Sequence, residues 1–125
     1  MTDRELLKLA AKAAGYTTIE YQNLKDSSLD IRYGIDEAIW NGEDYWNPLE
    51  DDGTALRLAV KLGLFKLGLF IYQIKVNGQK ITAVEWDFDY VGKTMIFDEM
   101  HKDNPYAATR RAIVRAAAEM AKELT

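Results

Sequence analysis

The sequence has no cysteine, one histidine and only two prolines. Without cysteine, a disulfide scaffold, a Cys-ligated zinc or iron–sulfur site and a thiol nucleophile are all excluded. Any site that needs two histidine ligands is excluded as well, because His101 is the only histidine. The lack of disulfides is typical of a protein from a reducing compartment.

Long apolar runs are also missing. The most apolar stretch, residues 62–76, is interrupted by Lys66, Gln73 and Lys75, so it is too short between charges to span a bilayer. The first 16 residues carry five charged side chains within their apolar pattern and therefore do not form the hydrophobic region of a signal peptide. We expect a protein of the cytoplasm that does not enter a membrane.

The 125 residues are 48% hydrophobic and 29% charged, which is typical of one globular domain with a single core. We therefore treat residues 1–125 as one domain. Sixteen basic and 20 acidic side chains give a net charge of −4. This charge disfavours binding of nucleic acid or an anionic membrane by the whole surface, although a local basic face remains open.

Three segments have the apolar spacing of α-helices: residues 3–14, 51–62 and 105–123. Thr2 and Glu5 form a capping box at the start of the first. Asp51 or Asp52 can cap the second, and Gly63 supplies a residue that commonly ends a helix. Asn104 precedes the third, and Pro105 takes its first helical position, where proline is tolerated.

The remaining segments alternate apolar and polar residues, as strands do. We predict a hairpin within residues 17–33, a second hairpin from residues 65–76 and 80–90 joined by an Asn-Gly turn, and a short strand at residues 94–97. Residues 35–53 show turn signals rather than one long regular element. An exposed edge within the alternation from Phe65 to Ile71 would favour pairing with a second copy, so a homodimer is one expected state.

The order of elements is helix, strands, helix, strands, helix. We predict an α+β fold, specifically a three-layer α/β/α sandwich in which three helices pack on an antiparallel-rich sheet.

Three stretches of the sequence resemble one known family. They are TDRELLKLAAKAAG, WNPLEDDGTALRLAVKLG and DNPYAATRRAIVRAAAEMAK, and together they cover about fifty of the 125 residues. In this order they are similar to the phage ABA sandwich domain, a family of small bacteriophage and prophage proteins. The resemblance implies an α/β/α sandwich that works in the cytoplasm of a bacterial host, and it implies no catalytic residue.

Acidic and aromatic residues are concentrated in residues 34–56, which contain seven acids and no Lys or Arg. Trp and Tyr provide large contact areas at low entropic cost, and carboxylates steer association with a basic partner. The predicted partner-binding surface consists of Trp40, Glu43, Asp44, Tyr45 and Trp46. The alternative is a solvated loop whose tryptophans cover the sheet, and for residues 46–49 we expect a structural lid over the second helix.

Basic residues on the last predicted helix offer an alternative function. Arg110, Arg111 and Arg115 lie on its polar side and could contact phosphate oxygens of a nucleic acid. Glu119 and Glu123 interleave with them on the same side, which is more typical of a solvated helix face.

A second alternative is a metal-dependent enzyme built around Asp87, Asp89 and His101, with Asp98 and Glu99 nearby. Oxygen ligands and an imidazole can hold a divalent cation, and two carboxylates can divide acid and base roles. The spacing matches no known signature, and phosphate-binding loops and nucleophile motifs are missing.

We therefore expect no enzyme activity, no cofactor and no metal. We expect a phage accessory protein that binds a host or phage protein. Inhibition of a host defence or regulatory system is one expected role.

Overall fold

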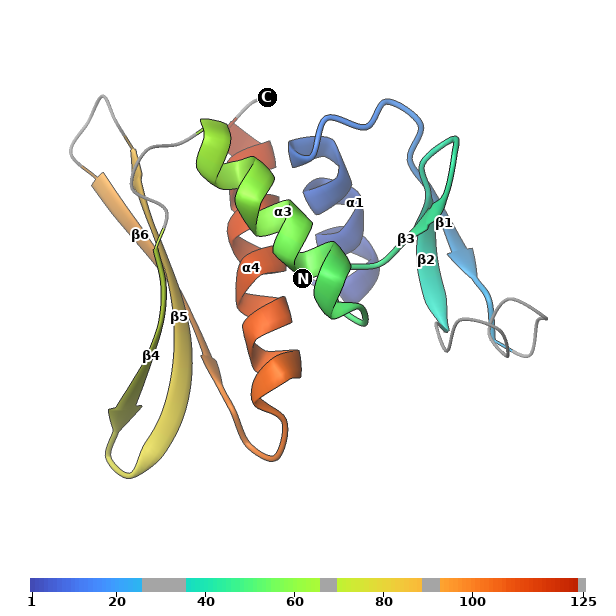
Figure 1. Cartoon of the computed structure of the whole chain (residues 1–125). Coiled ribbons are helices and arrows are strands. Elements are labelled where there is room, and N and C mark those ends of the chain that lie inside the picture. The colour runs from blue at the N-terminus through green and yellow to red at the C-terminus, as the bar shows by residue number, and fades with distance from the viewer. Residues whose placement is uncertain (26–35, 66–69, 89–92, 124–125) are drawn as a thin grey trace.

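The computed structural model of the chain describes residues 1–25, 36–65, 70–88 and 93–123. These residues form three helices and two antiparallel sheets of three strands each. The helices lie between the two sheets (Figure 1). The predicted α+β class, its three helices and its antiparallel sheets are confirmed, with the difference that the helices form the central layer and do not lie outside a single sheet.

Helix α4 (Pro105–Glu123) lies between sheet B and the other two helices. It packs against α1, α3, β5 and β6, and buried side chains occupy nearly its whole circumference. A helix that is apolar over most of its circumference must be covered over most of it. Most of these side chains are alanines, which let the neighbouring elements approach closely. The helix begins where the sequence predicts, since Asn104 Oδ1 accepts a hydrogen bond of 3.0 Å from the Ala107 amide.

Helix α1 (Asp3–Ala13) carries the predicted capping box. The Glu5 amide donates to Thr2 Oγ1 at 3.2 Å, and the Thr2 amide donates to Glu5 Oε2 at 3.0 Å. The helix buries its leucine and alanine stripe between α4 and the first sheet. No helix in the described part of the chain is long and apolar enough to cross a membrane.

Helix α3 (Asp52–Phe65) is longer than the sequence predicts. It continues through Gly63 to Phe65, so the predicted end at Gly63 and the predicted strand start at Phe65 are both wrong. A glycine inside a helix costs only about 1 kcal/mol relative to alanine, and the burial of Leu62 next to it outweighs that cost. Residues 66–69, which include the rest of the Phe65–Ile71 alternation before Phe70, lie outside the described residues.

Asp51 caps α3. Its Oδ2 accepts hydrogen bonds from the Thr54 amide at 2.8 Å and from the Thr54 hydroxyl at 2.6 Å. These two bonds lower the pKa of the Asp51 carboxyl, because they favour its charged form. The cap therefore stabilises the fold fully at a pH above the ordinary carboxyl pKa, and this contribution is lost as the pH falls through the lowered value.

We expect Asp51→Ala to lower the free energy of unfolding by about 1 kcal/mol at neutral pH, which is typical for loss of an N-cap. The difference between the variant and the parent chain should shrink below about pH 4, the range in which an ordinary aspartate is protonated. Urea unfolding at pH 7 and pH 3 checks this, with exposed Asp103→Ala as the control. A difference that is the same at both pH values would contradict it.

Sheet A contains β1 (Glu20–Asn23), β2 (Glu37–Trp40) and β3 (Tyr45–Trp46), in that order across the sheet. Strand β1 pairs antiparallel with β2, a pairing that the sequence did not predict. The second half of the hairpin predicted within residues 17–33, namely residues 29–33, lies outside the described residues. The segment predicted to be irregular supplies β2 and β3, because the fully buried Ile39 gives β2 an apolar contact with the core.

Sheet B contains β4 (Phe70–Val76), β5 (Gln79–Phe88) and β6 (Lys93–Met100). The predicted Asn77–Gly78 hairpin joins β4 to β5, with φ angles of 51° and 79° at its two turn residues. Positive angles at both positions are the reason that Asn-Gly is favoured there. Strand β6 is longer than predicted and pairs with β5 along its whole length.

Candidate functional site

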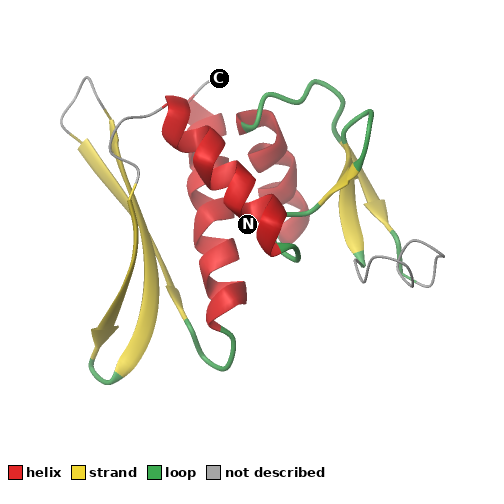
Figure 2. Ribbon diagram, in the orientation of Figure 1, coloured by secondary structure: helices red, strands yellow, loops and turns green. Residues whose placement is uncertain are grey.

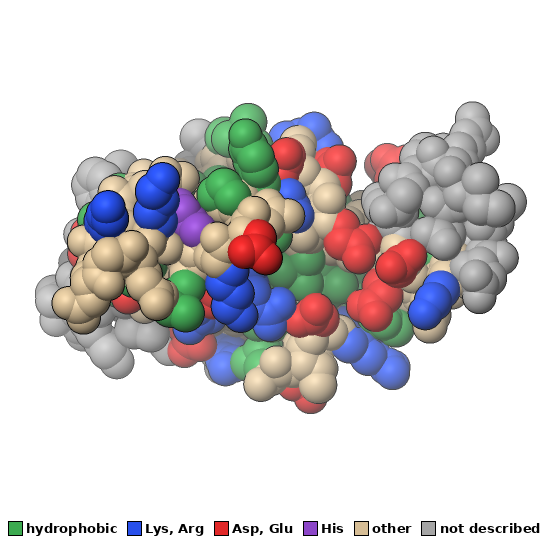
Figure 3. All heavy atoms as spheres, turned by 90° about the horizontal axis from the view of Figure 1, so that it is seen from below, with side chains coloured by type: hydrophobic (Ala, Val, Ile, Leu, Met, Phe, Trp, Pro, Cys, Tyr) green, Lys and Arg blue, Asp and Glu red, His purple; other side chains and the backbone are tan. Residues whose placement is uncertain are grey.

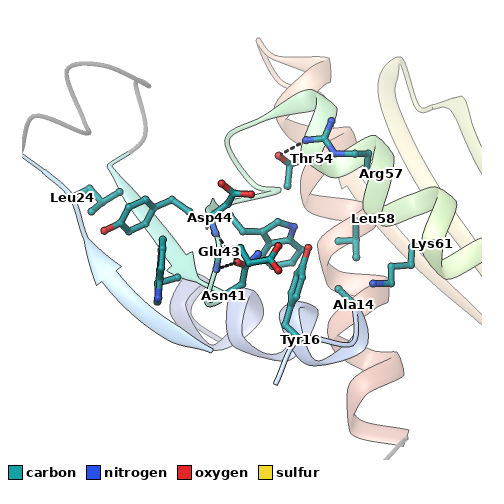
Figure 4. Close-up of a pocket in the computed structure, with 13 residues that line it drawn as sticks. Ala14, Tyr16, Leu24, Asn41, Glu43, Asp44, Thr54, Arg57, Leu58 and Lys61 are labelled. Atoms are coloured by element: carbon teal, nitrogen blue, oxygen red, sulfur yellow. Dashed lines mark hydrogen bonds between the residues drawn. The ribbon is translucent and has the colours of Figure 1, made fainter. Parts of the chain in front are cut away.

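A cleft of about 500 Å³ lies between the β2–β3 hairpin and helix α3 (Figure 4). This volume is within the range of about 300–1,000 Å³ that ligand sites in proteins occupy. The cleft has a wall from the hairpin, a wall from α3 and an aromatic floor between them.

The turn of the hairpin forms the first wall. Asn41 Oδ1 accepts hydrogen bonds from the amides of Glu43 at 3.0 Å and Asp44 at 2.9 Å. Gly42, between Asn41 and Glu43, has a φ of 98°, which a glycine adopts without strain. The turn holds the Glu43 and Asp44 carboxylates in solvent at the rim of the cleft.

A pair of aromatic rings follows the turn on the two strands. Trp40 and Tyr45 are opposite each other in the register of β2 and β3, and their ring centroids are 5.1 Å apart. The Tyr45 hydroxyl donates a hydrogen bond of 3.2 Å to Gln22 Oε1 on β1. Both rings are half-buried, so each retains exposed area that a partner could cover.

Trp46 and Tyr16 form the floor. Trp46 is only 8% exposed and belongs to the hydrophobic core. Its ring packs edge to face against Tyr16, with centroids 5.5 Å apart and planes at 75°. The Lys61 ammonium lies 5.4 Å from the centroid of the Tyr16 ring, a distance at which a cation is attracted to an aromatic face.

Helix α3 supplies the opposite, cationic wall through Arg57 and Lys61, which are one helical turn apart. The Arg57 guanidinium donates from Nη2 to Thr54 Oγ1 at 3.3 Å. Figure 4 shows Glu43 and Asp44 on the hairpin side of the cleft and Arg57 and Lys61 on the helix side. Within the described residues no ion pair joins the two walls, so both sets of charges can meet a ligand.

All five residues of the predicted partner-binding surface line this one cleft. The structure divides their roles, because Trp46 is buried in the floor while Trp40 and Tyr45 are half-buried. Burial of Asn47 and Pro48 beside Trp46 agrees with the structural lid expected for residues 46–49. Sequence reasoning missed the contribution of Tyr16 and of the cationic wall. The only sequence signal for the cationic wall is the one-turn spacing of Arg57 and Lys61. This spacing does not show which residues the helix faces.

The three arginines predicted for nucleic-acid binding form ion pairs within the protein. Each forms an ion pair with a carboxylate on another element: Arg110 with Asp52, Arg111 with Asp3 and Arg115 with Glu99. Arg110 also donates from Nε to the Leu49 carbonyl at 2.7 Å. A phosphate group would therefore have to replace contacts that tie α4 to α1, α3 and β6.

The residues predicted for a metal-dependent enzyme do not form a cluster within the part of the chain that the structure describes. The side chain of Asp87 and all of Asp89 lie outside the described residues. His101 is buried, with Nε2 2.6 Å from the Thr82 hydroxyl, which is in turn 3.0 Å from the Thr109 hydroxyl. This polar chain joins sheet B to α4. In the part of the chain that the structure describes, no three His, Asp or Glu side chains are placed to hold a metal ion.

Comparison of the chain with family models, with curated proteins and with solved structures found no match. The resemblance to the phage ABA sandwich domain therefore stays a prediction from the three sequence stretches. The fold and the cleft define a small α+β protein with a candidate binding site.

Proposed function

We propose that this chain is a non-enzymatic accessory protein of a phage or prophage, which binds a host or phage protein in the bacterial cytoplasm through the cleft between the β2–β3 hairpin and α3. One observation carries the proposal. The acidic and aromatic residues that the sequence singles out for partner binding line a single cleft with exposed charge at its rim.

The chemistry of the cleft favours a partner segment with a basic side chain. A Lys or Arg that enters from the hairpin side would lie beside the exposed Glu43 and Asp44 carboxylates and close to the half-buried rings of Trp40 and Tyr45. Both contacts are favourable for a cation, because carboxylates pair with it and aromatic faces attract it. An acidic group next to it on the partner would complement Arg57 and Lys61 on the other wall.

A binding protein of this kind can inhibit without catalysis. Occupying a basic surface of a host defence or regulatory protein blocks whatever that surface normally contacts. Carboxylates at an exposed rim also speed encounter with a basic surface, in a way that weakens as salt rises.

Affinity capture from infected host lysate tests the proposal, with the double variants Trp40→Ala/Tyr45→Ala and Glu43→Lys/Asp44→Lys compared with the parent chain. We expect each double variant to reduce capture of the partner at least about tenfold, since interface aromatics commonly contribute 2 kcal/mol or more. Trp46 is left unchanged because its replacement would damage the core. Asp103→Lys, an exposed acid outside the cleft, is the control and should capture normally. Equal capture by all variants would overturn the proposed surface.

A further inference from the structure

The chain contains two Asn-Gly dipeptides, Asn41–Gly42 and Asn77–Gly78. Both lie in hairpin turns, and the two glycines have positive φ angles of 98° and 79°. An asparagine that precedes a glycine loses its side-chain amide most readily, because glycine has no side chain to keep its amide nitrogen away from the asparagine. The two dipeptides have the same chemistry, and the fold gives them different surroundings.

The surroundings of Asn77 leave its side chain able to react. Asn77 and Gly78 are exposed, and among the described residues no hydrogen bond holds the Asn77 side chain. Apart from the neighbouring residues in the chain, no described atom lies within 4 Å of the position that a Cβ would take on Gly78. Figure 2 shows this turn at the end of the long β4–β5 hairpin, away from the helices. Local opening at such a hairpin end costs little free energy.

The side chain of Asn41 is held by hydrogen bonds. Its Oδ1 accepts two bonds from backbone amides, at 3.0 Å and 2.9 Å, and the Asn41 amide donates to the Asp44 carbonyl at 3.2 Å. A Cβ on Gly42 would lie 3.5 Å from Thr18 Cβ, so another segment covers this turn. The two bonds to Oδ1 draw electrons from the side-chain carbonyl, which favours attack on it. They must break before the side chain can rotate toward the Gly42 nitrogen, however, and this cost is the larger effect.

The charges near the two turns favour the same difference. Lys75 and Lys80 are exposed cross-strand partners, one pair beyond the residues that flank the β4–β5 turn. Figure 3 shows Lys and Arg side chains beside the histidine at the end of the molecule that carries sheet B. Glu43 and Asp44 directly follow the other dipeptide. The attacking group is the glycine amide nitrogen after it has lost its proton, and positive charge stabilises such an anion whereas carboxylates destabilise it.

We propose that Asn77 is a site of spontaneous deamidation in the folded protein, and that the fold protects Asn41 from the same reaction. The Gly78 nitrogen loses its proton to solvent and attacks Cγ of Asn77. The new N–Cγ bond closes a succinimide ring, while the Cγ–Nδ2 bond breaks and Nδ2 takes a proton from solvent and leaves as ammonia. Water then adds to one of the two ring carbonyl carbons, whose bond to the ring nitrogen breaks, and the nitrogen regains a proton. Addition at Cγ gives aspartate, and addition at the main-chain carbonyl carbon gives isoaspartate.

The two products have different consequences for sheet B. Aspartate keeps the turn, because Asp-Gly is also favoured there, and it makes the net charge of −4 more negative by one. Isoaspartate leads the main chain through Cβ and lengthens the turn, so that the pairing of Val76 with Gln79 no longer fits. Sheet A and sheet B lie on opposite sides of the helices (Figure 1), so this reaction does not depend on the proposed function of the cleft.

Incubation of the full chain at mildly alkaline pH, with peptide mapping by mass spectrometry at intervals, tests the proposal. We expect the peptide that contains Asn77 to gain the mass difference between an amide and a carboxyl group, as a mixture of aspartate and isoaspartate. The peptide that contains Asn41 should change at least about tenfold more slowly, because its two hydrogen bonds must break first. Asn77→Asp is the control variant, and it should release no ammonia from this turn.

The same chain in concentrated urea separates the effect of the fold from that of the local sequence. Once the fold is lost, the two dipeptides should react at rates within roughly threefold of each other. A folded chain in which Asn77 does not react, or in which Asn41 reacts as fast as Asn77, would overturn the proposal. An equally strong preference for Asn77 in urea would show that the fold protects nothing, and it would overturn the proposal as well.

Discussion

Replacing Trp46 with alanine is expected to lower the free energy of unfolding by about 3–5 kcal/mol, the usual range for removing a large buried aromatic side chain. Trp46 is 8% exposed and packs edge to face on Tyr16, so the variant loses both the burial of the indole and an aromatic pair. Single domains are stable by only about 5–15 kcal/mol. The variant should therefore be close to the limit of stable folding at 25 °C.

Urea unfolding followed by far-UV circular dichroism measures this loss. Trp40→Ala is the matched control, because Trp40 lies on the same hairpin but is only half-buried. It should cost less than half as much. Equal losses for the two variants would show that Trp46 contributes no more to the core than the half-buried Trp40 does.

Ala117→Leu is expected to destabilise the protein by about 1–3 kcal/mol through overpacking, and by more if the neighbours cannot move. Ala117 has no exposed area and lies on the central helix, which is in contact with two helices and two strands. Leucine has nearly the helix propensity of alanine, so the loss reports side-chain crowding and not a change in the backbone.

The unfolding midpoint in urea measures the effect, and Ala107→Leu is the control. Ala107 lies on the first turn of the same helix and is only half-buried, so leucine there has room to turn toward solvent. A change of less than about 0.5 kcal/mol is expected for such a surface position. If Ala117→Leu is equally mild, the small side chains of α4 are not what allows its neighbours to approach.

The cleft is assembled from parts of the chain that are distant in the sequence. The cleft combines carboxylates, aromatic rings and cations from three separate segments, at Tyr16, the β2–β3 hairpin and α3. The cleft thus suits the charged partner segment that we propose.

Features that depend on a few neighbouring residues could be predicted from the sequence. The capping box at Thr2, the aspartate cap of α3, the Asn-Pro start of α4 and the Asn77–Gly78 turn are all present. Each is decided by backbone hydrogen bonds or φ angles within about four residues. The acidic aromatic segment could also be found, because it is a property of composition.

Features that depend on contacts between distant residues required the tertiary structure. Strand β1 pairs with β2, and α3 passes through Gly63, because burial against the core outweighs the local signals. The same burial separates Trp46 from Trp40 and brings Arg57 and Lys61 opposite the acidic turn. It also places α4 between sheet B and the other two helices, because a helix that is apolar over most of its circumference must be covered on most sides. Residue type and spacing thus determined the local elements, and only the shared core decided which surfaces remain exposed.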